Sequence, residues 1–311
     1  MIDVEQLRKS FNGKCALDGF TLHVGAGDLF GLVGPNGAGK TTLMKVLSTL
    51  LPVDSGTAQV GGVNVSAKAR EVKRLIGYLP DQPGVYQDMS VREFLEFFAD
   101  AFQLTGARHR AAVDRALERS GLAERSEDSV EQLSFGMKQR LVLAKTLLHD
   151  PKVLLLDEPA TGLDPLARIE LREQLKQLHA EGITILISSH ILSDLEDICT
   201  QIALIGAGRN ATDAEGHSVL QLRAAQTPVR IYEIEVIGDS AAAVAIVNSA
   251  AGARVLDSSM GRMVAEVTGA DEQAASLLRA LVVGGVNVLR FDHRALDLEE
   301  RYKTVFREKN A

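Results

Sequence analysis

The sequence has little cysteine and no long hydrophobic run, and both absences limit what the protein can be. Its two cysteines, Cys15 and Cys199, lie far apart without metal-ligand spacing, which excludes a disulfide framework or zinc site and favours a reducing compartment. No apolar stretch approaches the roughly 20 residues that cross a bilayer, so service to a membrane would need a membrane-embedded partner. Basic residues are outnumbered, 34 against 41 acidic ones, and the net charge of −7 disfavours a nucleic-acid binder.

The remaining composition is that of an ordinary globular protein. Hydrophobic residues make up 46% and charged residues 24% of 311 residues, enough for a sizeable core. The length predicts about two domains of about 150 residues each. We find no internal repeat and no low-complexity tract.

One glycine-rich segment fits the phosphate-loop pattern G-x-x-x-x-G-K-[ST] without a mismatch. Its residues are Gly34, Pro35, Asn36, Gly37, Ala38, Gly39, Lys40 and Thr41, with Thr42 following. The apolar segment 28–33 before it predicts a buried strand, and apolar spacing over 42–50 after it predicts a helix. Glycines let backbone N–H groups curl around phosphate, and the helix points its positive end at the same anion. Lys40 adds a charge near the terminal phosphates, and Thr41 offers a hydroxyl to Mg²⁺.

Two carboxylates follow the apolar run 153–156. By itself, the sequence Asp157-Glu158-Pro159 is typical of a solvated acidic turn. Beside a phosphate loop, however, Asp157 can hold Mg²⁺ through water together with Thr41. Glu158 is then the natural base or orienting group for an attacking water.

A third signal is the segment Leu133-Ser134-Phe135-Gly136-Met137. It starts an amphipathic helix expected over 134–149, and Ser134 can simply cap that helix.

With its neighbours, this segment resembles the signature of the nucleotide-binding subunits of ATP-binding cassette (ABC) transporters. The resemblance covers about residues 2–210 and includes five motifs in the family's order. Phe135 stands where the family usually has glycine and Met137 where it has glutamine, a relaxation typical of drug- and polysaccharide-exporting members.

The resemblance assigns roles to further residues. Segment 161–164, ending at Asp164, corresponds to the family's D-loop, and His190 to its switch histidine, which contacts the γ-phosphate. Alone, a histidine after a strand is more often a capping or packing residue. Phe11 lies where the family stacks an aromatic ring on adenine, although a core position near a turn explains it equally well.

The chain departs from the family at one sensor position. The slot after 76–80 usually holds glutamine, but here it holds Asp81, with Gln82 next to it. Either side chain offers an oxygen to Mg²⁺ and the attacking water. Asp81 would add negative charge beside a triphosphate, which is unfavourable unless Mg²⁺ or Lys40 offsets it.

Strands alternate with helices through the first two thirds of the chain, which predicts an α/β fold. We expect a phosphate-loop, ABC-type domain over 1–215, with a mixed sheet and a helical subdomain at about 84–150 in which Val91, Phe94 and Leu95 lie on an apolar stripe. A polar, broken linker over 216–227 precedes a domain over 228–311. Its βαββαβ order is that of a small α+β, ferredoxin-like fold, followed by a helix over 296–307.

The resemblance also implies partners and ligands. The cofactors would be ATP and Mg²⁺, with the nucleotide held between two subunits: the phosphate loop of one, and Ser134 and Gly136 of the other, at a helix N-terminus. The second subunit is a further copy or a homologue, and the pair would lie on the cytoplasmic face of the membrane, bound to a permease. The predicted function is the ATPase motor of an ABC-2-type exporter. The alternative is a soluble ABC-type ATPase acting on nucleic acid or ribosomes, which usually carries a second cassette or a coiled-coil insert.

Overall fold

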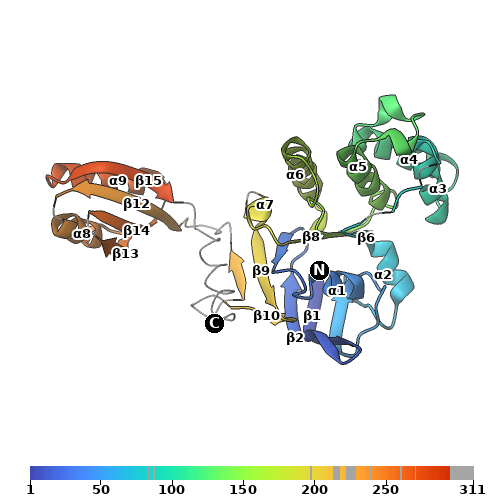
Figure 1. Ribbon diagram of the computed structural model, residues 1–311, viewed down its shortest axis with the longest axis horizontal. Helices are drawn as coiled ribbons and strands as arrows, with labels where there is room; N and C mark the ends of the chain where they lie inside the picture. Colours follow the sequence, from blue (N-terminus) through green and yellow to red (C-terminus); the bar gives the residue numbers. More distant parts are fainter. Residues whose placement is uncertain are drawn as a thin grey trace. The chain divides into compact units, whose positions relative to one another are not determined.

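The computed structural model describes residues 1–82, 84–86, 88–196, 198–212, 218–221, 229–238, 240–259, 261–269 and 271–294. The chain divides into two compact units, Met1–Leu222 and Arg223–Ala311 (Figure 1). Each unit has its own hydrophobic core. The helix expected over 296–307 lies outside the described residues.

The first unit contains an antiparallel sheet in the order β2-β1-β4-β5. Its strands are β1 (Ile2–Phe11), β2 (Lys14–Val24), β4 (Ser55–Val60) and β5 (Val63–Asn64). Alternate residues of β1 and β2, among them Val4, Leu22 and Val24, are buried and pack onto α1 (Lys40–Leu47). This alternation is the period-two pattern of strands buried on one face.

The central sheet has the order β10-β9-β3-β8-β7-β6, and β11 pairs with β9. Its parallel core consists of β3 (Leu29–Val33), β6 (Ile76–Leu79), β7 (Val153–Asp157), β8 (Thr184–Ser189) and β9 (Gln201–Gly206). Strands β3, β7 and β8 are buried at every residue, as expected of strands covered on both faces. The short strands β10 (Arg209–Asn210) and β11 (Val219–Gln221) run antiparallel to β9, so the sheet is mixed.

Further helices connect these strands, and the α-helices over 91–146 lie together as a group (Figure 1). The helices are α2 (Ala69–Leu75), α3 (Val91–Ala101), α4 (Gly106–Ser120), α5 (Phe135–Thr146), α6 (Pro165–Ala180) and α7 (Ser193–Glu196), with short 3-10 turns at Ala123–Arg125 and Val130–Gln132. Within the predicted helical subdomain, α3 and α4 are separate helices, since Gln103 and Gly106 between them adopt positive φ angles. Helix α6 was not predicted, although Asp164 as N-cap and Pro165 in the first turn are a recognisable start signal.

The second unit has the expected βαββαβ order. Its elements are β12 (Val229–Ile237), α8 (Ser240–Ser249), β13 (Ala253–Ser259), β14 (Arg262–Thr268), α9 (Asp271–Val283) and β15 (Asn287–Arg294). The sheet order β13-β14-β12-β15 is antiparallel throughout, as in a ferredoxin-like fold. One expectation needs correction at the boundary. Residues 219–221, expected in the linker, form β11 and hydrogen-bond to β9 because their backbone groups complete that sheet's edge.

Candidate functional site

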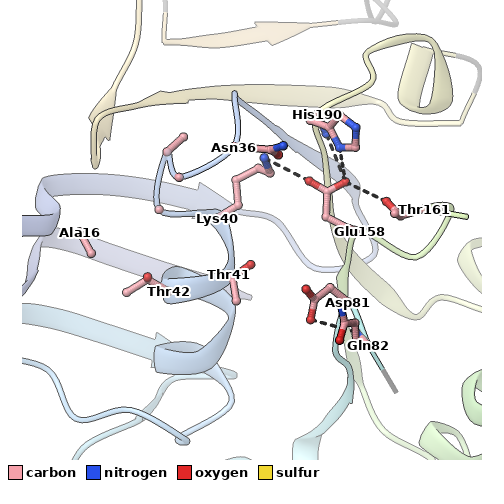
Figure 2. A pocket seen from close by; sticks show the side chains of 13 residues that line it. Ala16, Asn36, Lys40, Thr41, Thr42, Asp81, Gln82, Glu158, Thr161 and His190 are labelled. Carbon is pink, nitrogen blue, oxygen red and sulfur yellow. Dashed lines mark hydrogen bonds and ion pairs between the residues drawn. The ribbon is translucent and has the colours of Figure 1, made fainter. Parts of the chain in front are cut away.

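A cavity of about 340 Å³ opens at the carboxyl ends of the central strands (Figure 2). Thirteen residues line it: Ala16, Asn36, Gly37, Ala38, Gly39, Lys40, Thr41, Thr42, Asp81, Gln82, Glu158, Thr161 and His190. They come from segments far apart in the sequence. The cavity lies at the strand ends, where open parallel sheets bind their ligands.

The phosphate loop forms one wall of the cavity. It joins β3 to α1, and its glycines are sterically required. A Cβ on Gly34 would lie 2.2 Å from the Ile205 carbonyl oxygen, and one on Gly39, whose φ is +111°, would lie 2.6 Å from that of Ala16. Lys40 Nζ donates to the carbonyl oxygens of Gly34 (2.6 Å) and Pro35 (3.2 Å). The loop is therefore already curled around its own lysine, with the N-terminus of α1 facing the cavity.

Glu158 lies between two cationic or hydrogen-bonding groups. One carboxylate oxygen is 3.1 Å from Lys40 Nζ, and the other is 2.7 Å from His190 Nδ1. The Thr161 hydroxyl donates to the second oxygen at 3.4 Å (Figure 2). Glu158 has a φ of +49°, which is strained for a residue with a Cβ. The residue after β7 is thus held in a sparsely populated conformation at the mouth of the cavity.

The two neighbouring carboxyl groups differ in their electrostatics. Burial raises the pKa of Glu158, but hydrogen bonds and charge from His190 and Lys40 outweigh burial, so its pKa lies below the ordinary value. Burial dominates for Asp157 and raises its pKa, against hydrogen bonds from Ser188 and Thr41. Ser188 Oγ donates to Asp157 Oδ1 at 2.8 Å, whereas the buried Oδ2 has no hydrogen-bond partner among the described residues. A buried oxygen without a donor is suited to a cation or its bound water.

Asp81 and Gln82 both line the cavity, at the end of β6. Strand β6 runs parallel to β7, with Leu79 opposite Leu156, so the two strands end at the same edge of the sheet. The negative charge of Asp81 contributes to the raised pKa of Asp157. Both candidates for the sensor position therefore remain beside the predicted metal ligands.

The other predicted residues lie outside this cavity. Ser134 caps α5 by accepting from the Met137 N–H at 3.3 Å, and Asp164 caps α6 by accepting from the Ala167 N–H at 2.9 Å. Gly136 lies between them, and a Cβ there would approach that of Ala167 to 3.1 Å. Phe11, at the end of β1, is 42% exposed and lies under the Lys9 ammonium at 5.5 Å. None of these four belongs to the cavity lining, and neither do Gly34, Pro35 and the fully buried Asp157.

Sequence reasoning missed two lining residues, Ala16 and Thr161. Thr161 lies in the loop after Glu158, so its place as the first residue of the D-loop motif 161–164 was a usable signal. Ala16 comes from β2 and carries no chemical group that would have marked it. It is a neighbour of the phosphate loop only because the two sheets pack together.

The fold and the cavity define a phosphate-loop nucleoside triphosphatase. A family model described as ABC transporter matches residues 17–161. The Nod factor export ATP-binding protein I of Burkholderia pseudomallei is 39% identical over 231 residues, which are 74% of this chain and 76% of that protein. The daunorubicin resistance ATP-binding protein of Streptomyces coeruleorubidus is 38% identical over 286 residues, 92% of this chain and 89% of that protein. The similarity to the daunorubicin resistance protein covers 286 residues, more than the first unit contains, so it continues into the second unit.

Solved structures of ABC transporter subunits are also similar to this chain. An ATP-binding subunit of an ABC transporter is 30% identical with a TM-score of 0.61, covering 67% of this chain and 87% of that chain. The structure of cbiO1 from Clostridium perfringens, part of an ABC transporter complex, is 31% identical with a TM-score of 0.62, covering 67% of this chain and 85% of that chain. The chain belongs to the ABC transporter family. It is an ATP-binding, ATP-hydrolysing motor subunit, which confirms the family, fold class and activity predicted from the motifs. Among the described helices, none combines the length and hydropathy that a membrane crossing requires.

Proposed function

We propose that this chain powers an exporter by closing, with a second copy of itself or a homologous subunit, around ATP and Mg²⁺. The observation that carries the proposal is the position of Glu158 between Lys40 and His190, within the cavity formed by the phosphate loop. Export is favoured by the relatives, whose names include Nod factor export and resistance to daunorubicin and linearmycin.

Entry of a triphosphate changes the partners of Glu158. Lys40 is only 5% exposed and bonds to Glu158 and two loop carbonyls, so a phosphate entering the loop competes for this ammonium. The γ-phosphate likewise offers His190 a more highly charged acceptor. Glu158 is then released toward the cavity. Without Lys40 and His190 the causes that lower its pKa are gone and burial raises the pKa, which makes the carboxylate a better base for a water. Nucleotide binding and preparation of the base thus become one event.

The residues available for Mg²⁺ fit the ion. Thr41, Asp157, Asp81 and Gln82 offer hydroxyl, carboxylate and amide oxygens, which Mg²⁺ prefers, and Asp157 Oδ2 has no donor among the described residues. No group of three or more His, Cys, Asp or Glu side chains in the described part of the chain is placed to hold a metal. This agrees with an ion held by few protein ligands together with phosphates. Bound there, Mg²⁺ would neutralise charge on the phosphate oxygens.

A second copy supplies what the cavity lacks. Ser134, Gly136 and Asp164 lie at a corner where the N-termini of α5 and α6 meet, outside the cavity of their own chain. We assign this corner to the γ-phosphate bound by the other copy, because a helix N-terminus stabilises an anion only at close range. Phe11 is the candidate for stacking on adenine. Its ring is already exposed and could swing over a base.

A permease is the expected membrane partner. Tyr86, in the segment before α3, and Phe97, on α3, are 51% and 44% exposed, and their ring centroids are 5.4 Å apart. Behind them, Phe94 is buried and Phe98 half-buried. An exposed aromatic pair on a packed base is typical of an interface anchor. We propose that the permease binds this pair and holds the motor at the cytoplasmic face of the membrane.

Glu158→Gln tests the proposal. The amide cannot act as a base but keeps the shape, so ATP hydrolysis should fall by about a hundredfold or more while ATP still binds. Without hydrolysis the closed dimer should accumulate with ATP and Mg²⁺, as measured by sedimentation. Near-normal turnover would show that Glu158 is not the base. A variant that binds ATP but stays monomeric would rule out the two-copy mechanism.

A further inference from the structure

The sheet of the second unit ends on the edge strand β15, whose longest run of regular pairing is Arg290–Arg294. Over Arg290–Arg294, β15 pairs with β12 through consecutive residues, and no strand in the described ranges pairs with its other side. The opposite edge, β13, has a register shift between Val255 and Asp257 and ends in two serines. Irregular, polar edges resist the addition of a strand, whereas a regular edge presents a row of backbone donors and acceptors. Strand β15 has a register shift as well, between Val288 and Arg290, but the residues from Arg290 to Arg294 pair without interruption, so this stretch is the one open to strand addition.

This edge also carries an alternating charge pattern. Arg290 and Asp292 share one face of β15, with Arg290 Nε 2.6 Å from Asp292 Oδ2. Across the strand, Glu235 lies opposite Arg290, and Glu233 lies opposite Asp292. Two carboxylates opposite one another are unfavourable, and Arg290 is the neighbouring cation on β15. A further cation beside Asp292 would offset the repulsion between Asp292 and Glu233.

We propose that β15 pairs antiparallel with β15 of a second copy about a two-fold axis at Phe291, joining the two second units into one continuous sheet. This pairing would add a second contact between the two subunits and rests on the proposed two-copy function. The partner is a second copy because the charges of this strand complement themselves in that arrangement. A two-fold interface requires such self-complementarity.

The charges select one register. With the axis at Phe291, Arg290 of each copy lies opposite Asp292 of the other, so two cross-strand ion pairs form. An axis at Arg290 would place two guanidinium groups opposite each other, and an axis at Asp292 would do the same with two carboxylates. Phe291 lies on the opposite face of the strand, half-buried, with its ring centroid 4.8 Å from that of Tyr232. At the axis it would meet its own copy in an aromatic cross-strand pair, which is favourable.

Cysteine cross-linking of the full chain tests the pairing. The background is Cys15→Ser, to remove the exposed native thiol, with Lys40→Ala to disable the ATP-dependent contact. Residues opposite each other in antiparallel strands come close enough for a disulfide, so Phe291→Cys should cross-link to itself about tenfold faster than Asp257→Cys on the other edge. Equal rates at the two positions would overturn the proposal, whichever segment or partner covers β15.

Charge reversal provides an independent test that keeps the Phe291 ring. In the same background without ATP, Arg290→Asp should weaken self-association about tenfold, because carboxylates then face each other twice. Adding Asp292→Arg should restore it. A double variant as weak as the single one would contradict the register. The ATP-dependent dimer is measured separately with Glu158→Gln. A failure of the β15 pairing can therefore be distinguished from a failure of the ATP-dependent dimer.

Discussion

Lys40 and Glu158 form an ion pair across the cavity, with Nζ 3.1 Å from Oε1, although they lie 118 positions apart in the chain. Both side chains are largely buried, at 5% and 13% exposed. In this position, Glu158 and an incoming phosphate would compete for the same ammonium. Under the proposed function, we expect a phosphate that binds Lys40 to release Glu158, which would link nucleotide binding to catalysis.

The pair makes stability depend on pH through Glu158. Its pKa lies below the ordinary 4.5, so its ionised form stabilises the fold above that pH, and this contribution is lost as the pH falls through the lowered value. Glu158→Gln should therefore reduce the free energy of unfolding at pH 7 but less so near pH 4, as measured by urea unfolding at both.

Glu173→Gln is the matched control. Glu173 lies on the surface of α6 with Lys176 at 2.8 Å, and such pairs contribute little. Its effect should be small at both pH values. A Glu158→Gln effect that is the same at both would contradict the assignment of the stabilising charge.

Asp157→Asn should raise stability and remove function. Burial raises the pKa of Asp157, so its charge destabilises the fold increasingly as the pH rises above the ordinary 3.8. Asparagine keeps an acceptor for Ser188, so the nucleotide-free variant should melt a few degrees higher at pH 7. In the native chain, MgATP at about a hundredfold above its Kd should add about 2.7 kcal/mol, and the variant should lose most of this gain. A lower melting temperature without nucleotide would show that the buried charge is compensated.

The exposed aromatic pair Tyr86 and Phe97 should matter for coupling rather than catalysis. Replacing Tyr86 and Phe97 by serine leaves the buried Phe94 in place, so the fold and basal ATPase should persist. Transport by the complex with its permease should fall at least about tenfold, since exposed aromatic anchors often contribute 2 kcal/mol or more to an interface. Leu50→Ser, at a residue 55% exposed after α1, is the control. Transport equal to that of the control would remove the α3 surface from the interface.

Deleting 228–311 should leave nucleotide binding intact. The core of the first unit is built from β1 to β9 and α1, whereas the second unit packs Ile234, Met263 and Leu281 into a separate core. The ATP affinity of the shortened chain, measured by titration calorimetry, should therefore stay within about twofold of that of the full chain. Loss of binding would contradict the division into two independent units.

The sequence indicated the fold well where the local signal was strong. The pattern of Gly34 to Thr41 and its flanking segments was enough to predict a strand, a loop and a helix. The βαββαβ order of the second unit was predicted from the succession of strand-like and helix-like segments. It did less well where backbone conformation decided the outcome. The positive φ at Gln103 splits α3 from α4, and β11 forms only because β9 offers an edge. Such outcomes depend on contacts with residues outside the short stretch of sequence from which an element is predicted.

By itself, the sequence determined the chemistry: a lysine on a glycine loop, two acids after an apolar strand and a histidine after another. These follow from short segments, since the residue types and their spacing are set locally. Only the tertiary structure decided which groups meet. It brings Lys40, Glu158 and His190 together because β3, β7 and β8 are adjacent and parallel, so their carboxyl ends share one edge. It places Ser134 and Asp164 outside that cavity, since their helices begin at a different corner.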